Sequence, residues 1–336
     1  MSSIPVAIKE ISFYVPETVF TNDDMKKLVE TSDEWIRQRT GIVTRHLVSG
    51  DEDAVSMAVN AVKKLYPAGL NSQNTPDMIV CATSAPVRPY PSVACEVQAA
   101  IGADNASAFD ITAACSGFIY AMQIARANIQ SGFANRVLVV ASDATSKFLD
   151  WTDRGSCVLF GDGAAAMVVE KSEDGQDDFV ALKLKADGKC KEMISLKVKS
   201  ENCPLTEPSS EDEHNNKIFM AGRDVYKYVM QKIPAVIAET LNEAGLTVDD
   251  IDFFVPHQAN LRMIEALSSR IGFPPEKVLT NIEKYGNISA SSIPAVISEK
   301  LADGSIKCPA TLLISAFGAG MTSSAAIIRL REHTEG

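Results

Sequence analysis

The sequence predicts an α/β fold built from two halves of the same order, each with a buried sheet. Short apolar segments typical of strands alternate along the chain with longer segments of helical periodicity. The order also repeats, because IDFFVP at residues 251–256 corresponds to DMIVCATS at residues 77–84, and each is followed by a helix that ends in Ile-Gly. Together these two observations indicate a pseudo-duplicated chain.

The first half opens with a strand from Pro5 to a turn near Pro16, and the next helix has Thr21 or Asn22 as its N-cap. A second helical turn begins after Ser32. The later elements of this half are helix 53–66, strand 77–84, helix 93–101, a buried strand that enters a helix over residues 109–132, and strands 136–142 and 164–170.

The second half repeats this order. After strand 251–256 come a helix over residues 259–267, a short strand, a helix that follows Gly286-Asn287, and strands 311–317 and 325–330. If the halves pack sheet to sheet, Cys115 and Asn287 occupy related helix N-termini that face a shared centre. The polar segment 200–216 has no periodicity and is predicted to be an excursion from this framework.

Composition limits the class of protein. A chain of 336 residues with 46% hydrophobic residues has enough apolar surface for a large core. The net charge of −11 argues against general nucleic-acid binding, which needs a surface rich in Lys and Arg. No apolar run approaches the roughly 20 residues of a membrane span, and no signal-like leader is present. Seven cysteines without a CxxC pair indicate neither a disulfide framework nor a zinc site, so a cytoplasmic protein is predicted.

Cys115 is the first candidate for chemistry. It follows a turn of small residues and precedes a helix in FDITAACSGF, so the free amides and the helix dipole are expected to stabilise a thiolate near neutral pH. The alternative is a small buried cysteine with only a packing role, which is the more common use of this residue.

His257 is the histidine whose position indicates a function. It stands where strand 251–256 ends and a helix begins, whereas His46, His214 and His333 are predicted to be solvated surface residues. A lone histidine is often structural, and Asn287 in YGNISASS could serve only as an N-cap.

Cys115, His257 and Asn287 suit two classes of reaction. A cysteine hydrolase of the papain type uses this chain order, but its CGSCW-like run is absent and the duplicated pattern does not fit it. In the other class, the thiolate accepts an acyl group, and a carbanion made by decarboxylation of a malonyl thioester attacks it. The glycine-rich AFGAGM at residues 316–321 offers a second backbone amide for an oxyanion hole, but it is a poor phosphate loop.

Seven motifs in the same order resemble the β-ketoacyl-acyl-carrier-protein synthase III family of the thiolase superfamily: TSDEWIRQRTGI, FDITAACSGF, WTDRG, LFGDGAAA, VPHQANLR, YGNISASS and AFGAGM. The resemblance covers about residues 5–331. It implies a thiolase-like α/β fold in which two pseudo-duplicated βαβαβαββ halves, residues 1–173 and 174–336, form αβαβα layers. Asn287 points to the initiating branch, since chain-elongating relatives have a second histidine; thiolases would need a cysteine near Ala319.

The resemblance implies that Cys115 takes an acetyl-type group from acyl-CoA, while His257 and Asn287 support decarboxylation of malonyl-carrier protein. The product would be a 3-oxoacyl-carrier protein that initiates fatty-acid synthesis. The expected partners are acyl carrier protein, acyl-CoA and a second copy in a homodimer, without a metal, another cofactor, nucleic acid or membrane. The alternatives are a related condensing enzyme or acyltransferase of secondary metabolism, a thioester hydrolase, and a catalytically silent scaffold.

The family's motifs also imply the remaining site residues. The backbone amides of Cys115 and Ala319 would form the oxyanion hole, and the acyl pocket would include Phe160 and the dimer partner's Tyr90. The expected CoA contacts are Trp35, Arg39, Arg154, Gly222, Ala259 and Asn260, and the expected carrier-protein contacts are Lys227, Arg262 and Arg270. The chain departs from the common pattern at Ser323 and Ser324, where relatives have Trp-Gly, at Arg223, where they have Asn, and at Tyr90, which is often Phe.

Overall fold

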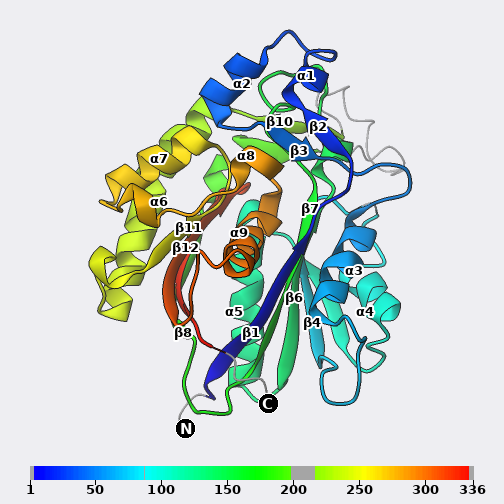
Figure 1. The fold of residues 1–336 in the computed structure, drawn as a ribbon, viewed down its shortest axis with the longest axis vertical. Helices are drawn as coiled ribbons and strands as arrows, with labels where there is room; N and C mark the ends of the chain where they lie inside the picture. Colours follow the sequence, from blue (N-terminus) through cyan, green and yellow to red (C-terminus); the bar gives the residue numbers. More distant parts are fainter. Residues whose placement is uncertain (1–3, 87, 198–215, 333–336) are drawn as a thin grey trace, which may run out of the picture.

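The computed structural model describes residues 4–86, 88–197 and 216–332. Two sheets lie at its centre, with helices between them and on both outer sides (Figure 1). The polar segment predicted over residues 200–216 falls outside the described residues except for Asn216, and so do His214 and His333.

The elements of the first half agree with the predicted ones to within a few residues, except that β2 and β3 were not assigned from the sequence. They are β1 (Val6–Tyr14), β2 (Val19–Thr21), α1 (Asn22–Met25), α2 (Asp33–Thr40), β3 (Thr44–His46), α3 (Ala54–Leu65), β4 (Met78–Ala82), α4 (Val93–Ile101), β5 (Ser107–Ile111), α5 (Gly117–Gln130), β6 (Arg136–Asp143) and β7 (Gly163–Lys171). Thr21 and Ser32 are the N-caps of α1 and α2, as the sequence predicts.

The second half contains β8 (Phe179–Ala186), β9 (Ile194–Leu196), β10 (Ile218–Met220), α6 (Gly222–Ala244), β11 (Phe253–Pro256), α7 (Leu261–Arg270), α8 (Ile282–Tyr285), α9 (Ser292–Ala302), β12 (Ala310–Gly318) and β13 (Thr322–Leu330). The sequence analysis did not assign β8, β9, β10 or α6. The signal for α6 was present, since Val225, Val229 and Ile233 recur at helical spacing, although Pro234 interrupts the pattern.

The two sheets repeat one order of strands. The first is β1-β7-β6-β4-β5 and the second is β8-β13-β12-β11. In both, two antiparallel pairings are followed by a parallel one. The short strand predicted before the last helix is reduced to a bridge between Phe254 and Val278, in the place that β5 has in the first sheet. The boundary predicted at residues 173/174 lies between β7 and β8, and the division into two domains there stays a prediction.

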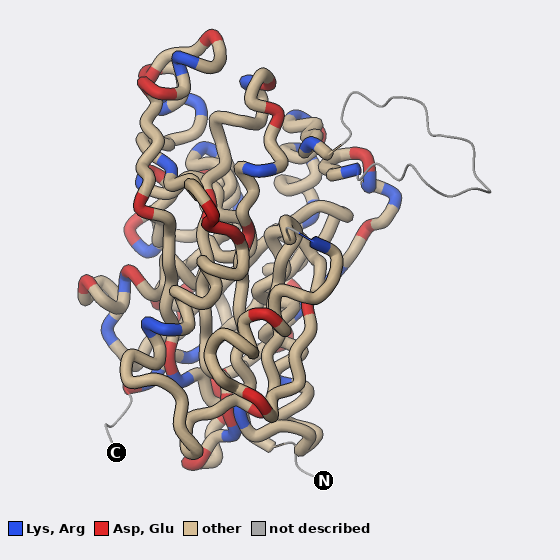
Figure 2. The backbone as a smooth tube through the Cα atoms, turned by 90° about the vertical axis from the view of Figure 1, so that its right-hand side faces the viewer, with Lys and Arg blue, Asp and Glu red and all other residues tan. Residues whose placement is uncertain are grey.

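Five layers result, in the predicted order αβαβα (Figure 1). Helices α3 and α4 cover the outer face of the first sheet, α5 and α9 lie between the sheets, and α6 and α7 cover the second sheet. The central cluster takes buried side chains from both sheets and both middle helices, among them Phe118, Val139, Val296 and Ile314. Acidic and basic residues are interspersed along the chain trace in Figure 2. The predicted thiolase-like α/β fold is therefore confirmed.

The strand before Cys115 differs from its prediction. It was expected to be buried, but β5 is the edge strand of the first sheet and Phe109 is 37% exposed. An edge strand leaves one row of backbone groups unpaired, so it can accept another strand.

Both middle helices begin with a strained turn of 3₁₀ type. Ala114 begins the turn before α5 with φ +47°, and Ser289 begins the turn before α9 with φ +53°. Left-handed backbone at a residue other than glycine costs on the order of 1–3 kcal/mol. The two turns match residue for residue, so the counterpart of Cys115 is Ala290 and not Asn287, which lies three residues earlier. The prediction of related helix starts is right for the elements and wrong in register.

Candidate active site

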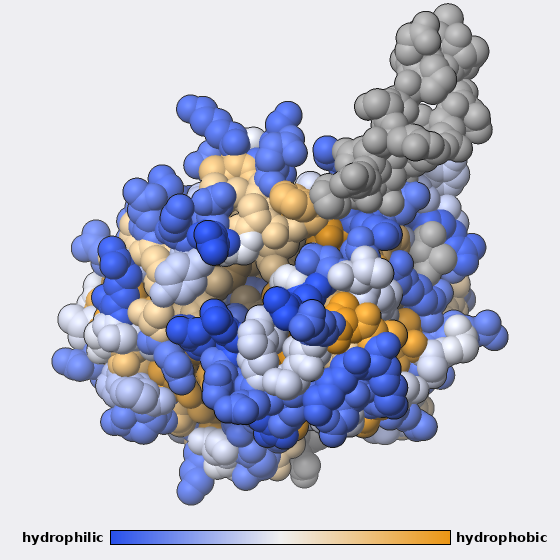
Figure 3. All heavy atoms as spheres, turned by 90° about the horizontal axis from the view of Figure 1, so that it is seen from above, coloured by the Kyte–Doolittle hydropathy of each residue, from blue (hydrophilic) through white to orange (hydrophobic). Residues whose placement is uncertain are grey.

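A cavity of about 910 Å³ opens on the upper face of the molecule, between residues of both halves. Figure 3 shows the hollow, with apolar walls and a rim of hydrophilic side chains. The predicted site residues that line it are Trp35, Arg39, Cys115, Arg154, Phe160, Gly222, His257, Ala259, Asn260, Arg262, Asn287 and Ala319. Tyr90, Lys227 and Arg270 do not line it.

Cys115 is held by the end of strand β12. A Cβ atom on Gly318 would lie 2.8 Å from the Cys115 amide nitrogen and 2.8 Å from the Ala113 carbonyl oxygen. The Thr322 hydroxyl donates to that carbonyl at 3.0 Å. Only glycine therefore lets the AFGAGM loop approach the nucleophile, which places Ala319 on the cavity wall beside it. That the amides of Cys115 and Ala319 form an oxyanion hole stays a prediction.

Gly318→Ala is expected to destabilise the fold by about 1–3 kcal/mol, because backbone atoms must move to admit the methyl group. Acylation of Cys115 should slow in parallel. Gly188→Ala is the matched control, since no atom lies within 4 Å of a Cβ built there. Urea unfolding of both variants measures the difference, and equal stability would contradict the close approach.

The expected resting thiolate is not found. Burial raises the pKa of Cys115 to about 12, and the contact with the Ser289 hydroxyl offsets only part of this effect. The helix start provides a few amides, whereas the half-buried position of the thiol on the cavity wall removes part of the water that would solvate a negative charge. The Cys115 thiol is therefore protonated at neutral pH and must lose its proton during the reaction.

His257 is buried and neutral. Its amide donates to the Ser315 carbonyl at 2.8 Å, and its ring meets Phe317 edge-on with centroids 5.4 Å apart. Burial lowers the pKa of His257 to about 3. A neutral imidazole can donate one hydrogen bond without bringing a charge into the cavity.

Ser292 sets which ring nitrogen of His257 carries the proton. The Ser292 Oγ lies 2.7 Å from Nδ1 and accepts a long hydrogen bond from the Gln258 amide at 3.4 Å. With the Gln258 amide directed at the oxygen, the Ser292 hydroxyl proton is free to point at Nδ1. We infer that Nδ1 accepts and that Nε2 carries the hydrogen, which faces the cavity.

Ser292→Ala is expected to slow condensation about tenfold, because the Nε2–H form of His257 loses the hydrogen bond that favours it. Acylation of Cys115 should change little. Ser298→Ala, on the same helix with its hydroxyl on the Ile11 carbonyl, is the control. Separate rates of adduct formation and product formation test this, and equal slowing of both steps would contradict it.

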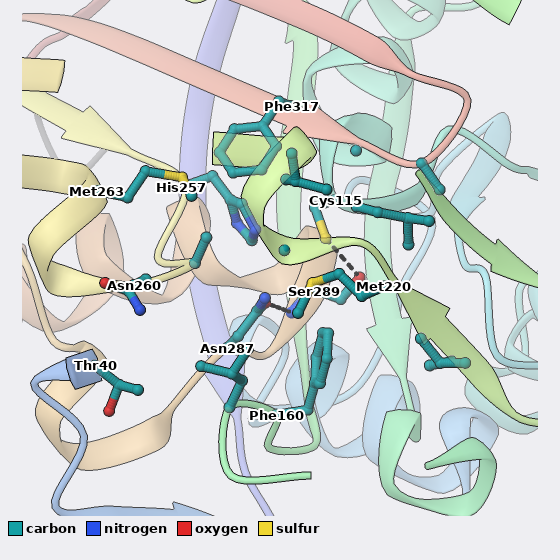
Figure 4. Close-up of a pocket in the computed structure, with 18 of the residues that line it drawn as sticks. Thr40, Cys115, Phe160, Met220, His257, Asn260, Met263, Asn287, Ser289 and Phe317 are labelled. Atoms are coloured by element: carbon teal, nitrogen blue, oxygen red, sulfur yellow. Dashed lines mark hydrogen bonds between the residues drawn. The ribbon is translucent and has the colours of Figure 1, made fainter. Parts of the chain in front are cut away.

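The two polar atoms of the Asn287 side chain differ in their hydrogen bonding. Its Oδ1 accepts the Ser289 amide at 2.9 Å, an Asx-type turn that resembles the cap considered from the sequence. Its Nδ2 donates to no described residue. Figure 4 shows the side chains of Cys115, His257 and Asn287 pointing toward one another. The three predicted residues thus meet, with two neutral donors facing one thiol.

The mouth of the cavity carries the predicted CoA contacts. The guanidinium carbon of Arg154 lies 4.9 Å from the Trp35 ring centroid, and that of Arg39 lies 5.9 Å from it. An aromatic base between Trp35 and Arg154 needs two van der Waals spacings of ~3.5 Å, so Arg154 must move by ~2 Å to admit it. Asn260 caps α7 and donates to the Arg39 carbonyl at 3.0 Å, which ties the two sides of the mouth together.

Three predicted residues lie elsewhere. Tyr90 is 83% exposed, Lys227 pairs with Asp224 at 3.4 Å, and Arg270 is exposed at the far end of α7. Their roles toward partners stay predictions. His46 was expected to be solvated, but it is half-buried and packs against the Tyr285 ring, so that prediction was wrong.

The departure at Ser323 and Ser324 is accommodated by hydrogen bonds. Both residues are buried. The Ser323 hydroxyl lies 3.2 Å from the Tyr228 hydroxyl, and the Ser324 hydroxyl donates to the Ala316 carbonyl at 3.4 Å. The strand behind the AFGAGM loop is therefore packed by satisfied polar groups at these two positions.

The sequence analysis missed several lining residues, including Asp143, Thr145, Met220, Ser289 and Phe317. Asp143 is the last residue of β6, and polar residues at the carboxyl ends of parallel strands commonly face a site. That position was the signal that could have found it.

No helix of the described residues is long and apolar enough to cross a membrane. No group of three or more His, Cys, Asp or Glu side chains within the same ranges is arranged to hold a metal ion.

Comparisons place the chain among known proteins. The family model for 3-oxoacyl-[acyl-carrier-protein] synthase III matches residues 109–188, and that for its C-terminal part matches residues 241–330. The β-ketoacyl-[acyl-carrier-protein] synthase III 1 of Bacillus cereus is 42% identical over 325 residues, which cover 96% of this chain and 98% of the relative. The enzyme of this name from Roseiflexus castenholzii is 40% identical over 316 residues, which cover 94% of this chain and 95% of the relative.

Solved structures agree. The crystal structure of 3-oxoacyl-[acyl-carrier-protein] synthase III from Aquifex aeolicus has a TM-score of 0.86 at 40% identity and covers 97% of this chain and 100% of that one. The priming β-ketosynthase of a polyketide biosynthetic pathway has a TM-score of 0.89 at 30% identity and covers 98% of this chain and 97% of that one.

Proposed function

Because this chain belongs to the β-ketoacyl-[acyl-carrier-protein] synthase III family, it condenses an acyl-CoA with malonyl-acyl-carrier protein to start fatty-acid synthesis, and we propose acetyl-CoA as its primer. The observation that supports this activity is the convergence of Cys115, His257 and Asn287 in one cavity. The cavity opens beside Trp35 and two arginines, a set suited to an aromatic base and phosphates.

In the first step, the Cys115 sulfur attacks the thioester carbonyl of the primer. A bond forms between sulfur and the acyl carbon, the bond from that carbon to the CoA sulfur breaks, and the thiol proton ends on CoA. The amides of Cys115 and Ala319 are proposed to bind the carbonyl oxygen while it carries negative charge.

In the second step, malonyl-carrier protein loses CO2 and its electron pair forms an enolate. Asn287 Nδ2 and His257 Nε2 are proposed to donate hydrogen bonds to the enolate oxygen, because both groups are neutral donors that face the cavity. The enolate carbon then attacks the Cys115 thioester and the bond from the acyl carbon to sulfur breaks. The products are the 3-oxoacyl-carrier protein and the Cys115 thiolate, which takes a proton from water to restore the thiol. No resident cofactor enters this scheme.

A homodimer is proposed through the edge of the first sheet. Strand β5 is unpaired on one side within the described chain, Phe109 is 37% exposed, and Tyr90 is 83% exposed nearby in sequence. Pairing of two β5 strands would cover these groups and present Tyr90 to the partner's acyl pocket beside Phe160.

Carrier-protein docking is proposed at Arg262, which lies at the mouth of the cavity, together with Lys227 and Arg270. The cytoplasm is the proposed compartment, because a reducing environment suits the six described cysteines, which are all free thiols.

Incubation with acetyl-CoA and malonyl-carrier protein tests the proposal. CO2 release and acetoacetyl-carrier protein are expected in equal amounts. A panel of longer and branched acyl-CoA primers tests the choice of acetyl, and higher turnover with any of them would overturn it. The similarity to a polyketide-priming ketosynthase supports a second candidate, priming of a secondary-metabolite chain. A marked preference for a non-acetyl primer would favour that role.

A further inference from the structure

A buried carboxyl group faces the cavity and has no part in the scheme above. Asp143 ends strand β6, is 1% exposed and lines the cavity. Its Oδ1 accepts three hydrogen bonds, from the amides of Ser84 at 2.7 Å and Ala85 at 3.1 Å and from the Thr83 hydroxyl at 3.2 Å. Its Oδ2 has no well-formed hydrogen bond within the described chain. A buried carboxylate oxygen without a donor is costly, so one open acceptor remains beside the site.

Ser289 lies between Asp143 and the nucleophile. Its Oγ is 3.6 Å from the Cys115 sulfur, as the dashed line in Figure 4 shows. The turn that begins at Ser289 packs against β6, and the Ser289 side chain is near enough to Asp143 to lower the pKa of that carboxyl, against a larger rise caused by burial. A carboxylate only accepts hydrogen bonds, so the open Oδ2 is an acceptor toward which the single Ser289 proton can turn. The lone pairs of the hydroxyl are then left for the Cys115 S–H.

We propose that Asp143, acting through Ser289, takes the proton of Cys115 during acyl transfer. The proton passes from sulfur to the Ser289 oxygen as the Ser289 proton passes to Asp143 Oδ2. The sulfur forms its bond to the acyl carbon and the CoA thiolate leaves. The same path then returns the proton, which ends on the CoA sulfur, so that atoms and charges balance.

His257 is the alternative acceptor. It could take the proton at Nε2 only as the other tautomer, with Nδ1–H on Ser292, and would then lack the hydrogen that the enolate step needs. A relay through Ser289 leaves His257 unchanged between the two steps. This inference rests on the proposed function, because it concerns the acylation of Cys115 by acyl-CoA.

Rapid-quench acylation by acetyl-CoA, read by intact mass, tests the relay. Asp143→Asn and Ser289→Ala are each expected to slow acylation about 100-fold, the lower end of the range for general base catalysis. The double variant should be no more than about twofold slower than the slower single variant, because both changes break one path. Condensation by enzyme that has first been fully acylated should stay within about threefold of wild type.

The variants include controls for folding. Alanine suits position 289, because Ala114 holds the matching left-handed position before α5. Asp162→Asn is the matched carboxylate control. Asp162 is also buried and also accepts backbone amides, from Val48 and Ser146, but it does not line the cavity. Its acylation rate should stay within about twofold of wild type.

The results that would contradict the relay differ from the one that would contradict the proposed function. If Asp143 acts only through its charge, which raises the pKa of Cys115, Asp143→Asn will acylate as fast as wild type or faster. That result, an unchanged rate in Ser289→Ala, or independent effects that multiply in the double variant would overturn the relay. If wild-type enzyme fails to acylate at all, the proposed function fails instead.

Discussion

Cys115→Ala is expected to abolish the acyl adduct and to lower condensation by on the order of 10⁴-fold or more, as removal of a nucleophile does in other covalent enzymes. No second thiol lines the cavity among the described residues, so nothing replaces the lost sulfur. The donors His257 and Asn287 remain, so malonyl-carrier protein should still lose CO2 without forming a carbon–carbon bond.

Intact mass after incubation with acetyl-CoA measures the adduct, and CO2 release measures the uncoupled reaction. Cys95→Ala is the control, because Cys95 is an exposed thiol outside the cavity. A stable adduct on the Cys115→Ala protein would show that another group carries the acyl chain. Loss of decarboxylation together with the adduct would contradict the separation of the two steps.

Asn287→Ala is expected to lower decarboxylation and condensation by about 10²–10³-fold, the usual effect of removing one oxyanion donor. Acylation should stay within a few-fold of wild type, because the proposed partner of Asn287 Nδ2 is the enolate and not the primer. The separate rates of adduct formation and CO2 release measure both effects.

Asn287→Asp separates the donor from the turn. A carboxylate oxygen can still accept the Ser289 amide, which keeps the local backbone, but it has no hydrogen for the enolate. An equal loss of condensation in both variants is therefore expected. Retained condensation in Asn287→Asp would assign Asn287 to the turn alone, and equal loss of acylation in Asn287→Ala would remove the division of roles.

The sequence carried the fold because strands, helices and their repeated order are local patterns. Strand 77–84 and its counterpart 251–256 share a pattern of apolar residues and occupy equivalent places in the two sheets. The meeting of Cys115, His257 and Asn287 followed from motif resemblance and from the duplication. The sequence did not reveal that Asn287 lies three residues before Ala290, the structural counterpart of Cys115. This register depends on the backbone angles at Ala114 and Ser289, which composition does not encode.

The larger error of the sequence predictions concerned the protonation state of Cys115. The helix start at Cys115 is visible in the sequence and argued for a thiolate. The walls that exclude water from the thiol come from segments more than 140 residues away, including Ser289 and Phe317, so its raised pKa could not be foreseen. Asp143 could have been suspected from its place at the end of β6, but its proximity to the nucleophile could not, since only the fold brings the end of β6 against the turn that begins at Ser289.

The cavity is divided between the two halves, since Cys115 and Arg154 come from one and His257 and Asn287 from the other. This arrangement links ligand binding to the stability of the folded chain. A ligand that fills the cavity binds the folded chain and not the unfolded one, so its binding free energy adds to the stability of the fold. At a concentration of 100 Kd that contribution is about 2.7 kcal/mol, comparable with the strain stored in the two left-handed turn residues Ala114 and Ser289. Substrate saturation thus offsets the cost of the strained turns that shape the site.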